Sequence, residues 1–182
     1  GLGKSSLARA IADKYHLKLI DIRLAQMDPT DLQGLPFKQG DRAVYAPMGT
    51  FPLAGDPLPE GKKGWLLLLD EMNSAAPAVQ AAAYRVVLDR QVGQFDLHEA
   101  VAVMAAGNLM TDKAIVQRQS TAMQSRLVHF KLEVDKDAWI SWADKNDIDY
   151  RVKSFIQWKP EALHRFDPNH AEETFPCPRT YE

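Results

Sequence analysis

The sequence has one cysteine, Cys177, and lacks long apolar runs. A single cysteine excludes an intramolecular disulfide, which fits a reducing compartment, and we expect a cytoplasmic protein. The longest apolar stretches, residues 65–69 and 100–107, are far shorter than the ~20 residues that a membrane-spanning helix requires. We therefore expect no membrane span.

Concentrated positive charge is also missing. The chain has 22 Lys and Arg residues against 24 Asp and Glu residues, spread without long runs of one sign, and its net charge is −2. Because phosphate-backbone affinity needs a concentrated basic surface, nucleic acid is not favoured as a partner. The histidines show no ligand spacing, and a lone cysteine gives no zinc pair, so we expect no transition-metal site. The 182 residues, 46% hydrophobic, can bury one sizeable core and a small satellite unit.

The chain begins with Gly1-Leu2-Gly3-Lys4-Ser5, which matches the end of the phosphate-loop pattern G-x-x-x-x-G-K-[ST]. We expect the leading glycine and the two residues after it upstream of Gly1, and we interpret the chain as a fragment. In such a loop, backbone N–H groups and the start of the next helix bind phosphate. Lys4 would reach the terminal phosphates, and the Ser5 hydroxyl would help to hold Mg²⁺. An ordinary glycine turn before a helix is the alternative.

A pair of acids follows an apolar run. Residues 65–69 are uninterruptedly apolar, as in a central parallel strand covered on both faces, and Asp70 and Glu71 come next. Ligands bind at the C-terminal ends of such strands, so we expect Asp70 to hold the metal's water shell and Glu71 to activate the attacking water. The alternative is a pair that caps the next helix. Together with the phosphate loop, the acids favour a nucleotide triphosphatase.

Further polar residues are candidates for contacts with phosphate or water. Asn108 follows the apolar strand predicted at 101–106, where its amide would hold the attacking water, although a turn also selects asparagine. Arg126 is the leading candidate for an arginine finger and Arg118 the second, and either can instead be a surface salt-bridge residue. Arg179 is a candidate second phosphate sensor or a solvated arginine near a chain end.

The remaining pattern predicts an α/β sheet followed by helices. The predicted helices are at 5–15, 28–34 and 75–90, and the predicted strands are at 17–22, 65–69, 100–106 and 127–132. Residues 35–64, rich in proline and glycine, are expected to form a long loop or hairpin insertion, and 93–98 a turn or small hairpin. Beyond residue 134 the pattern becomes amphipathic and helical.

The order of these motifs resembles that of an AAA+ ATPase, and within that superfamily the MoxR-type group. The segments that carry the resemblance are Leu19 to Leu24 (LIDIRL), Asp28 to Pro36 (DPTDLQGLP), Leu69 to Asn73 (LDEMN) and Phe175 to Glu182 (FPCPRTYE). The resemblance covers nearly the whole chain. It implies a P-loop NTPase fold with a three-layer parallel-sheet core over 1–133, a pore-side insertion at about 35–64, a client-facing hairpin at 92–99, and the start of a helical lid at 134–182.

The resemblance also implies roles, cofactors and partners. The implied ATP-binding residues are Gly1, Gly3, Lys4, Ser5, Ser6 and Arg179. The implied catalytic residues are Glu71, Asn108 and Arg126, and the implied Mg²⁺ ligands are Ser5 and Asp70. The implied protein is a homo-oligomer, typically a hexameric ring, whose ATP hydrolysis drives chaperone-like remodelling or maturation of a protein client. That client is frequently a von Willebrand factor A domain protein.

Two other functions stay open. One is a nucleotide-gated assembly or binding module in which hydrolysis is incidental, although the presence of Glu71 speaks against it. The other is a nucleic-acid-associated motor, which predicts a basic insertion. The insertion at 35–64 has four basic residues against three acidic ones, and this balance does not favour such a motor.

Overall fold

The computed structural model describes residues 3–108, 125, 127–165 and 175–181. These fall into two compact units, one of Ser5–Val128 and one formed mainly by His129–Glu182. Each unit has its own hydrophobic cluster. The boundary predicted between residues 133 and 134 stays a prediction.

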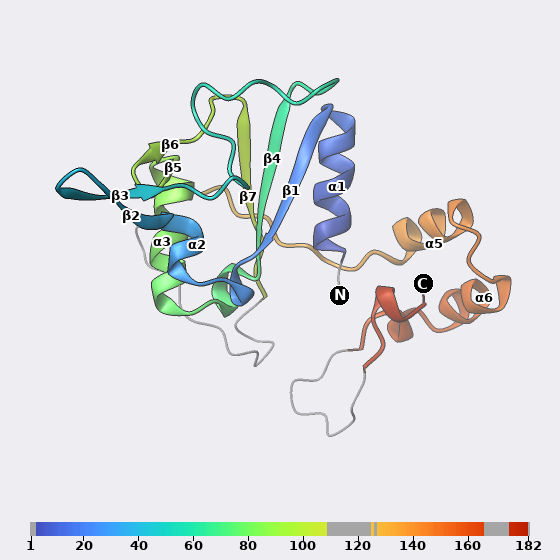
Figure 1. The fold of residues 1–182 in the computed structure, drawn as a ribbon. Helices are drawn as coiled ribbons and strands as arrows, with labels where there is room; N and C mark the ends of the chain where they lie inside the picture. Colours follow the sequence, from blue (N-terminus) through green and yellow to red (C-terminus); the bar gives the residue numbers. More distant parts are fainter. Residues whose placement is uncertain (1–2, 109–124, 126, 166–174, 182) are drawn as a thin grey trace. The chain divides into compact units, whose positions relative to one another are not determined.

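The first unit is built on a three-stranded parallel sheet in the order β1-β4-β7 (Figure 1). The strands are β1 (Leu17–Arg23), β4 (Gly64–Asp70) and β7 (Val101–Ala105). Every residue of the central strand β4 is buried, as expected for an apolar run covered on both faces. In the register, Arg23 lies opposite Asp70 and Leu69 opposite Ala105, so the C-terminal ends of the strands meet at one edge.

Helices cover both faces of this sheet, which gives three layers (Figure 1). On one face, Leu66 and Leu68 pack with Ala8 and Ala12 of α1 (Lys4–Lys14). The opposite face packs against α3 (Pro77–Leu88). The apolar residues of that second interface include Leu67, Leu69, Val79, Ala83 and Val86. The alternation follows from the two-residue period of a strand, and it confirms the predicted three-layer α/β core.

The insertion predicted at 35–64 contains a hairpin of β2 (Leu35–Gln39) and β3 (Arg42–Ala46). It begins after the short helix α2 (Pro29–Gln33), whose capping box is formed by Asp28 and Asp31. A second hairpin, β5 (Gln91–Val92) with β6 (Phe95–Asp96), matches the small hairpin expected near 93–98. Leu53 of the insertion forms a β-bridge with Leu97, and the Ala54 N–H donates to the Asp96 carbonyl at 2.9 Å. The insertion therefore contacts the second hairpin.

One predicted strand is wrong. Residues 127–132 are described and form no strand, and the side chains of Val128 and Phe130 are 80% and 85% exposed. A strand is stable only when a neighbour satisfies its backbone groups, and none of the sheets formed by the described residues includes this segment. The local sequence of this segment was therefore not sufficient evidence for a strand.

The second unit is helical, as predicted. Its α-helices are α5 (Lys136–Lys145) and α6 (Tyr150–Trp158), and its 3₁₀ turns are η4 (Pro160–Leu163) and η5 (Pro178–Tyr181). The helices begin at aspartate caps, Asp135 and Asp149, that accept hydrogen bonds from backbone N–H groups at 2.8 and 2.7 Å. Of the helices in the described residues, none has the length and apolar character needed to cross a membrane.

Candidate functional site

The hydroxyl of Ser5 and the carboxylate of Asp70 are brought together at the C-terminal edge of the sheet. Ser5 lies in the first turn of α1, after Gly3, whose φ of +75° lies in the left-handed region. Its Oγ donates a hydrogen bond to Asp70 Oδ2 at 3.2 Å. Asp70 ends β4 and is only 9% exposed. Ser5 of the glycine-rich motif and Asp70 of the acidic motif, which were predicted separately, are thus in direct contact.

This pair of oxygen donors fits Mg²⁺. That ion usually keeps several waters and takes only one or two protein ligands together with substrate phosphates, so a hydroxyl and a carboxylate are sufficient. A metal site built from protein ligands alone would need more groups. The described residues contain no group of three or more His, Cys, Asp or Glu that could hold a metal. The first turn of α1 has no acidic residue, so the N-terminal end of its dipole suits a phosphate.

Glu71 has an unusual backbone conformation, with φ 56° and ψ 32° in the left-handed region. Non-glycine residues rarely adopt this region, and such strain clusters at functional sites. The Glu71 N–H donates to Asp70 Oδ1 at 2.8 Å, so Asp70 accepts one hydrogen bond on each oxygen. The helix-capping alternative is wrong for Glu71: it precedes η2 (Met72–Ser74) without a side-chain capping bond to a described residue.

Asn73 joins the acidic loop to Asn108. Its Nδ2 donates to the Asn108 carbonyl at 2.6 Å, and its Oδ1 accepts from the Asn108 N–H at 3.0 Å. Asn73 is only 8% exposed. Asn73 belongs to the segment LDEMN, but its role could not be predicted, because a contact between residues 73 and 108 leaves no trace in either local sequence.

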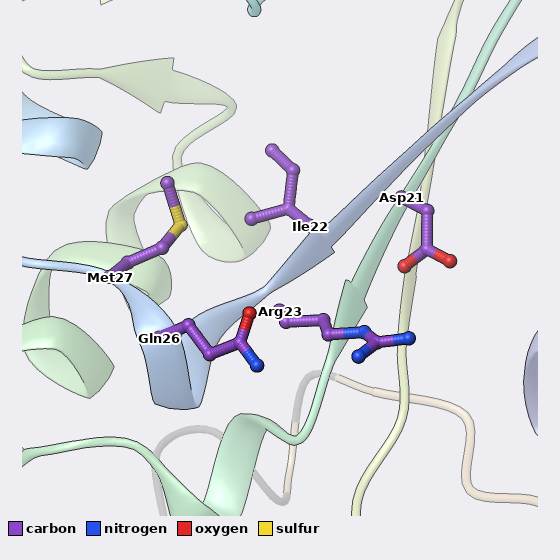
Figure 2. A pocket seen from close by; sticks show the side chains of 5 residues that line it. All are labelled: Asp21, Ile22, Arg23, Gln26 and Met27. Atoms are coloured by element: carbon purple, nitrogen blue, oxygen red, sulfur yellow. The ribbon is translucent and has the colours of Figure 1, made fainter.

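A second missed feature lies at the end of β1. Arg23 is the register partner of Asp70, and Asp21 and Arg23 stand on one side of β1 while Ile22, buried in the core, stands on the other (Figure 2). These residues line an open depression of about 520 Å³ together with Gln26 and Met27. The two-residue period of β1 places Arg23 on the sheet face that packs against α1. A cation on that face favours a phosphate ligand.

Some of the other predicted site residues lie in the described part of the chain and others lie outside it. Lys4 is the first residue of α1, and Ser6 lies in its first turn. Arg179 lies in η5 of the second unit, and its role stays a prediction. The predicted residues that fall outside the described part are Gly1, Arg118 and Arg126.

Comparisons with known proteins bear on the fold. No protein-family model and no curated protein matches the chain. A protein from Cytophaga hutchinsonii, named as a candidate ATPase, has a similar structure: the TM-score is 0.53 and the identity 18%, over 81% of this chain and 43% of that one. For NtrX from Brucella abortus the TM-score is 0.44 and the identity 18%, over 82% and 37%, a likeness too weak to carry an argument. This chain spans less than half the length of either protein.

The parallel sheet, its two helical layers and the first of these likenesses establish the fold. It is a three-layer α/β fold with a parallel sheet, as predicted for a P-loop NTPase core, followed by helices. At 18% identity the likeness concerns the fold alone. The function of the site therefore depends on its residues and does not follow from the fold.

Proposed function

We propose that this chain is the catalytic core of an ATPase that binds ATP with Mg²⁺ and hydrolyses it. The observation that carries the proposal is the hydrogen bond between Ser5 and Asp70. A glycine turn at a helix start and an acid at a strand end are each common. Their direct contact, at the edge where α/β sheets bind ligands, is the arrangement that nucleotide chemistry needs.

Each residue then has a chemical task. Lys4 and the N-terminus of α1 bind the terminal phosphates, and Ser5 and Asp70 hold the metal. The bound Mg²⁺ supplies positive charge that offsets charge developing on the transferred phosphoryl group. Glu71 accepts a proton from the attacking water, and Asn108 orients that water. The Ser5 hydroxyl and the Glu71 N–H each donate to one oxygen of Asp70, and these two hydrogen bonds orient the carboxylate as a metal ligand.

We further propose that the ATPase is a ring-forming, cytoplasmic AAA+ protein of the MoxR type, typically a hexamer, that remodels a protein client. The motif order supports the family, and the exposed hairpin β2–β3 supports the kind of client. Its apolar residues Leu35, Phe37 and Tyr45 are 54%, 47% and 43% exposed. Exposed apolar side chains of this kind favour protein over nucleic acid as the bound macromolecule. A von Willebrand factor A domain protein is the proposed partner class.

In such a ring the active site lies between subunits. We propose that Arg126 of one subunit reaches the ATP bound by its neighbour, and that Arg179 contacts the nucleotide of its own subunit. Positive charge delivered to the γ-phosphate is a large term in phosphoryl transfer, worth roughly 10³-fold or more in rate. Turnover per subunit should therefore rise with assembly.

The test is steady-state ATP hydrolysis by the full-length protein as a function of protein concentration. We expect specific activity to rise with concentration. Glu71→Gln should abolish turnover while keeping ATP binding, and Arg126→Ala should lose the concentration-dependent part. Arg118→Ala tests the second candidate for the arginine finger and should keep the concentration-dependent part. Absent turnover, or turnover that survives Glu71→Gln, would overturn the ATPase and leave a nucleotide-gated module.

A further inference from the structure

The side chain of Asn73 acts as an additional peptide group at the end of the sheet. Beyond the β4–β7 ladder, the Ala106 N–H donates to the Leu69 carbonyl and the Met72 N–H to the Ala106 carbonyl, both at 2.9 Å. The next two bonds come from the Asn73 amide, which donates to the Asn108 carbonyl at 2.6 Å and accepts from the Asn108 N–H at 3.0 Å. The Asn73 amide thus continues the β4–β7 hydrogen bonding at the point where the backbone of η2 no longer runs beside the chain after β7.

Few side chains can make this pair of bonds. The site needs a donor and an acceptor in one plane, and a carboxylate has no donor while an aliphatic residue has neither. The fit is also tight, because a Cβ added to Gly107 would lie 2.6 Å from Asn73 Oδ1. Asn73 is buried, so losing it would leave two backbone groups of Asn108 without their partner in the site.

The connection matters because of which residues it joins. Glu71 is two residues before Asn73 and is held in a left-handed conformation by the turn into η2. Asn108 is the residue whose backbone the Asn73 amide holds. The spacing between a proton acceptor and a water-orienting amide must be kept within a fraction of an ångström, since a displacement of about 1 Å can cost on the order of 10²-fold in rate.

We propose that Asn73 is a positioning residue that fixes Asn108 relative to Glu71 for the attack of water on ATP. The inference rests on the proposed ATPase function. It predicts that Asn73 acts through Asn108 and not through nucleotide binding, which involves the other end of the site at Lys4 and Ser5.

The kinetic test is a double-mutant cycle in the full-length protein. Asn73→Ala should lower kcat on the order of 10-fold to 100-fold with little change in the KM for ATP. The near-isosteric Asn73→Asp replaces the donor with a charged oxygen that faces the Asn108 carbonyl. It should also lower kcat, so a folding failure of the alanine variant does not decide the matter. Combined with Asn108→Ala, either change should lower kcat no further than Asn108→Ala alone. Independent, multiplying losses would overturn the proposal.

A second readout does not depend on turnover. Amide hydrogen exchange at Asn108 should be slow in the wild type and should speed up in Asn73→Ala, while the Ala106 N–H, bonded to the Leu69 carbonyl, stays protected. Wild-type hydrolysis with unchanged Asn108 exchange in the variant would overturn the positioning role alone. Absent wild-type hydrolysis would overturn the proposed function, and the exchange result would then still show whether Asn73 holds Asn108.

Discussion

The Ser5 hydroxyl donates to the Asp70 carboxylate at 3.2 Å across 65 residues of sequence. The contact exists because α1 packs on the sheet face to which the even-numbered residues of β4 belong: Leu66 and Leu68 meet Ala8 and Ala12 in one cluster. Asp70 is the next even-numbered residue of β4 and therefore belongs to the same face of the sheet. The alanines allow a close approach of the helix, and the first turn of α1 therefore ends beside the acid.

Asp70→Asn should remove the Mg²⁺ dependence of turnover. An amide keeps the shape of the carboxylate but loses its charge, so Mg²⁺ binds weakly and kcat should fall on the order of 10²-fold or more. ATP titration with and without Mg²⁺ checks the reason, because only the Mg²⁺-dependent part of the affinity should be lost. Asp89→Asn, at the exposed end of α3, is the matched control. Equal losses in both variants would contradict the assignment.

Gly107→Ala should destabilise the edge of the sheet and lower turnover as Asn73→Ala does. The new methyl would lie 2.6 Å from Asn73 Oδ1, and forcing a methyl into a packed site costs about 1–3 kcal/mol. Thermal unfolding and ATP hydrolysis measure the two effects. Gly49→Ala is the control, since a Cβ there meets no described atom within 4 Å. An unchanged unfolding midpoint in Gly107→Ala would mean that the asparagine can move aside.

Leu68→Ala should cost more stability than any exposed substitution in the first unit. Leu68 is fully buried between the sheet and α1, and truncating such a residue to alanine costs about 2–5 kcal/mol. Denaturant unfolding of the variant gives the change in free energy. Leu58, which is 52% exposed, provides the matched control as Leu58→Ala. Similar losses for both would mean that β4 is not the centre of the core.

Protonation of Asp149 should make the second unit less stable at low pH. A side-chain hydrogen bond from Arg151, followed by the Arg151 backbone N–H, lowers the pKa of Asp149 from 3.8 to about 2. A pKa that is lower in the folded state adds stability above the ordinary value, and this stability is lost as pH falls from about 4 to about 2.

The measurement is the helical signal of thermal unfolding between pH 5 and pH 2, for the wild type and Asp149→Asn. Asparagine keeps the capping ability of the residue and removes only the charge. The wild type should have the higher midpoint at pH 5, and the difference should disappear towards pH 2. Because the pair is exposed, added salt should reduce the difference as well. A difference that is independent of pH would contradict the role of the charge.

The local sequence pattern was sufficient to predict the elements that have a clear hydrophobic pattern or turn residues at their ends. The apolar run at 65–69 became the buried β4, and the glycine turn before residue 4 became the start of α1. Local pattern was wrong for 127–132, which form no strand and where Val128 and Phe130 lie exposed. A strand depends on a neighbour far away in sequence, whereas a helix satisfies its own backbone.

The sequence by itself determined that Ser5 and Asp70 each stand at the end of a regular element, because glycine, leucine and acidic residues in those orders have local conformational consequences. The tertiary structure alone decided that Asn73 binds the backbone of Asn108, that Arg23 stands beside Asp70 in the register, and that Glu71 adopts a left-handed conformation. These relationships arise from strand order and layer packing, which bring distant segments together and which no single stretch of sequence encodes.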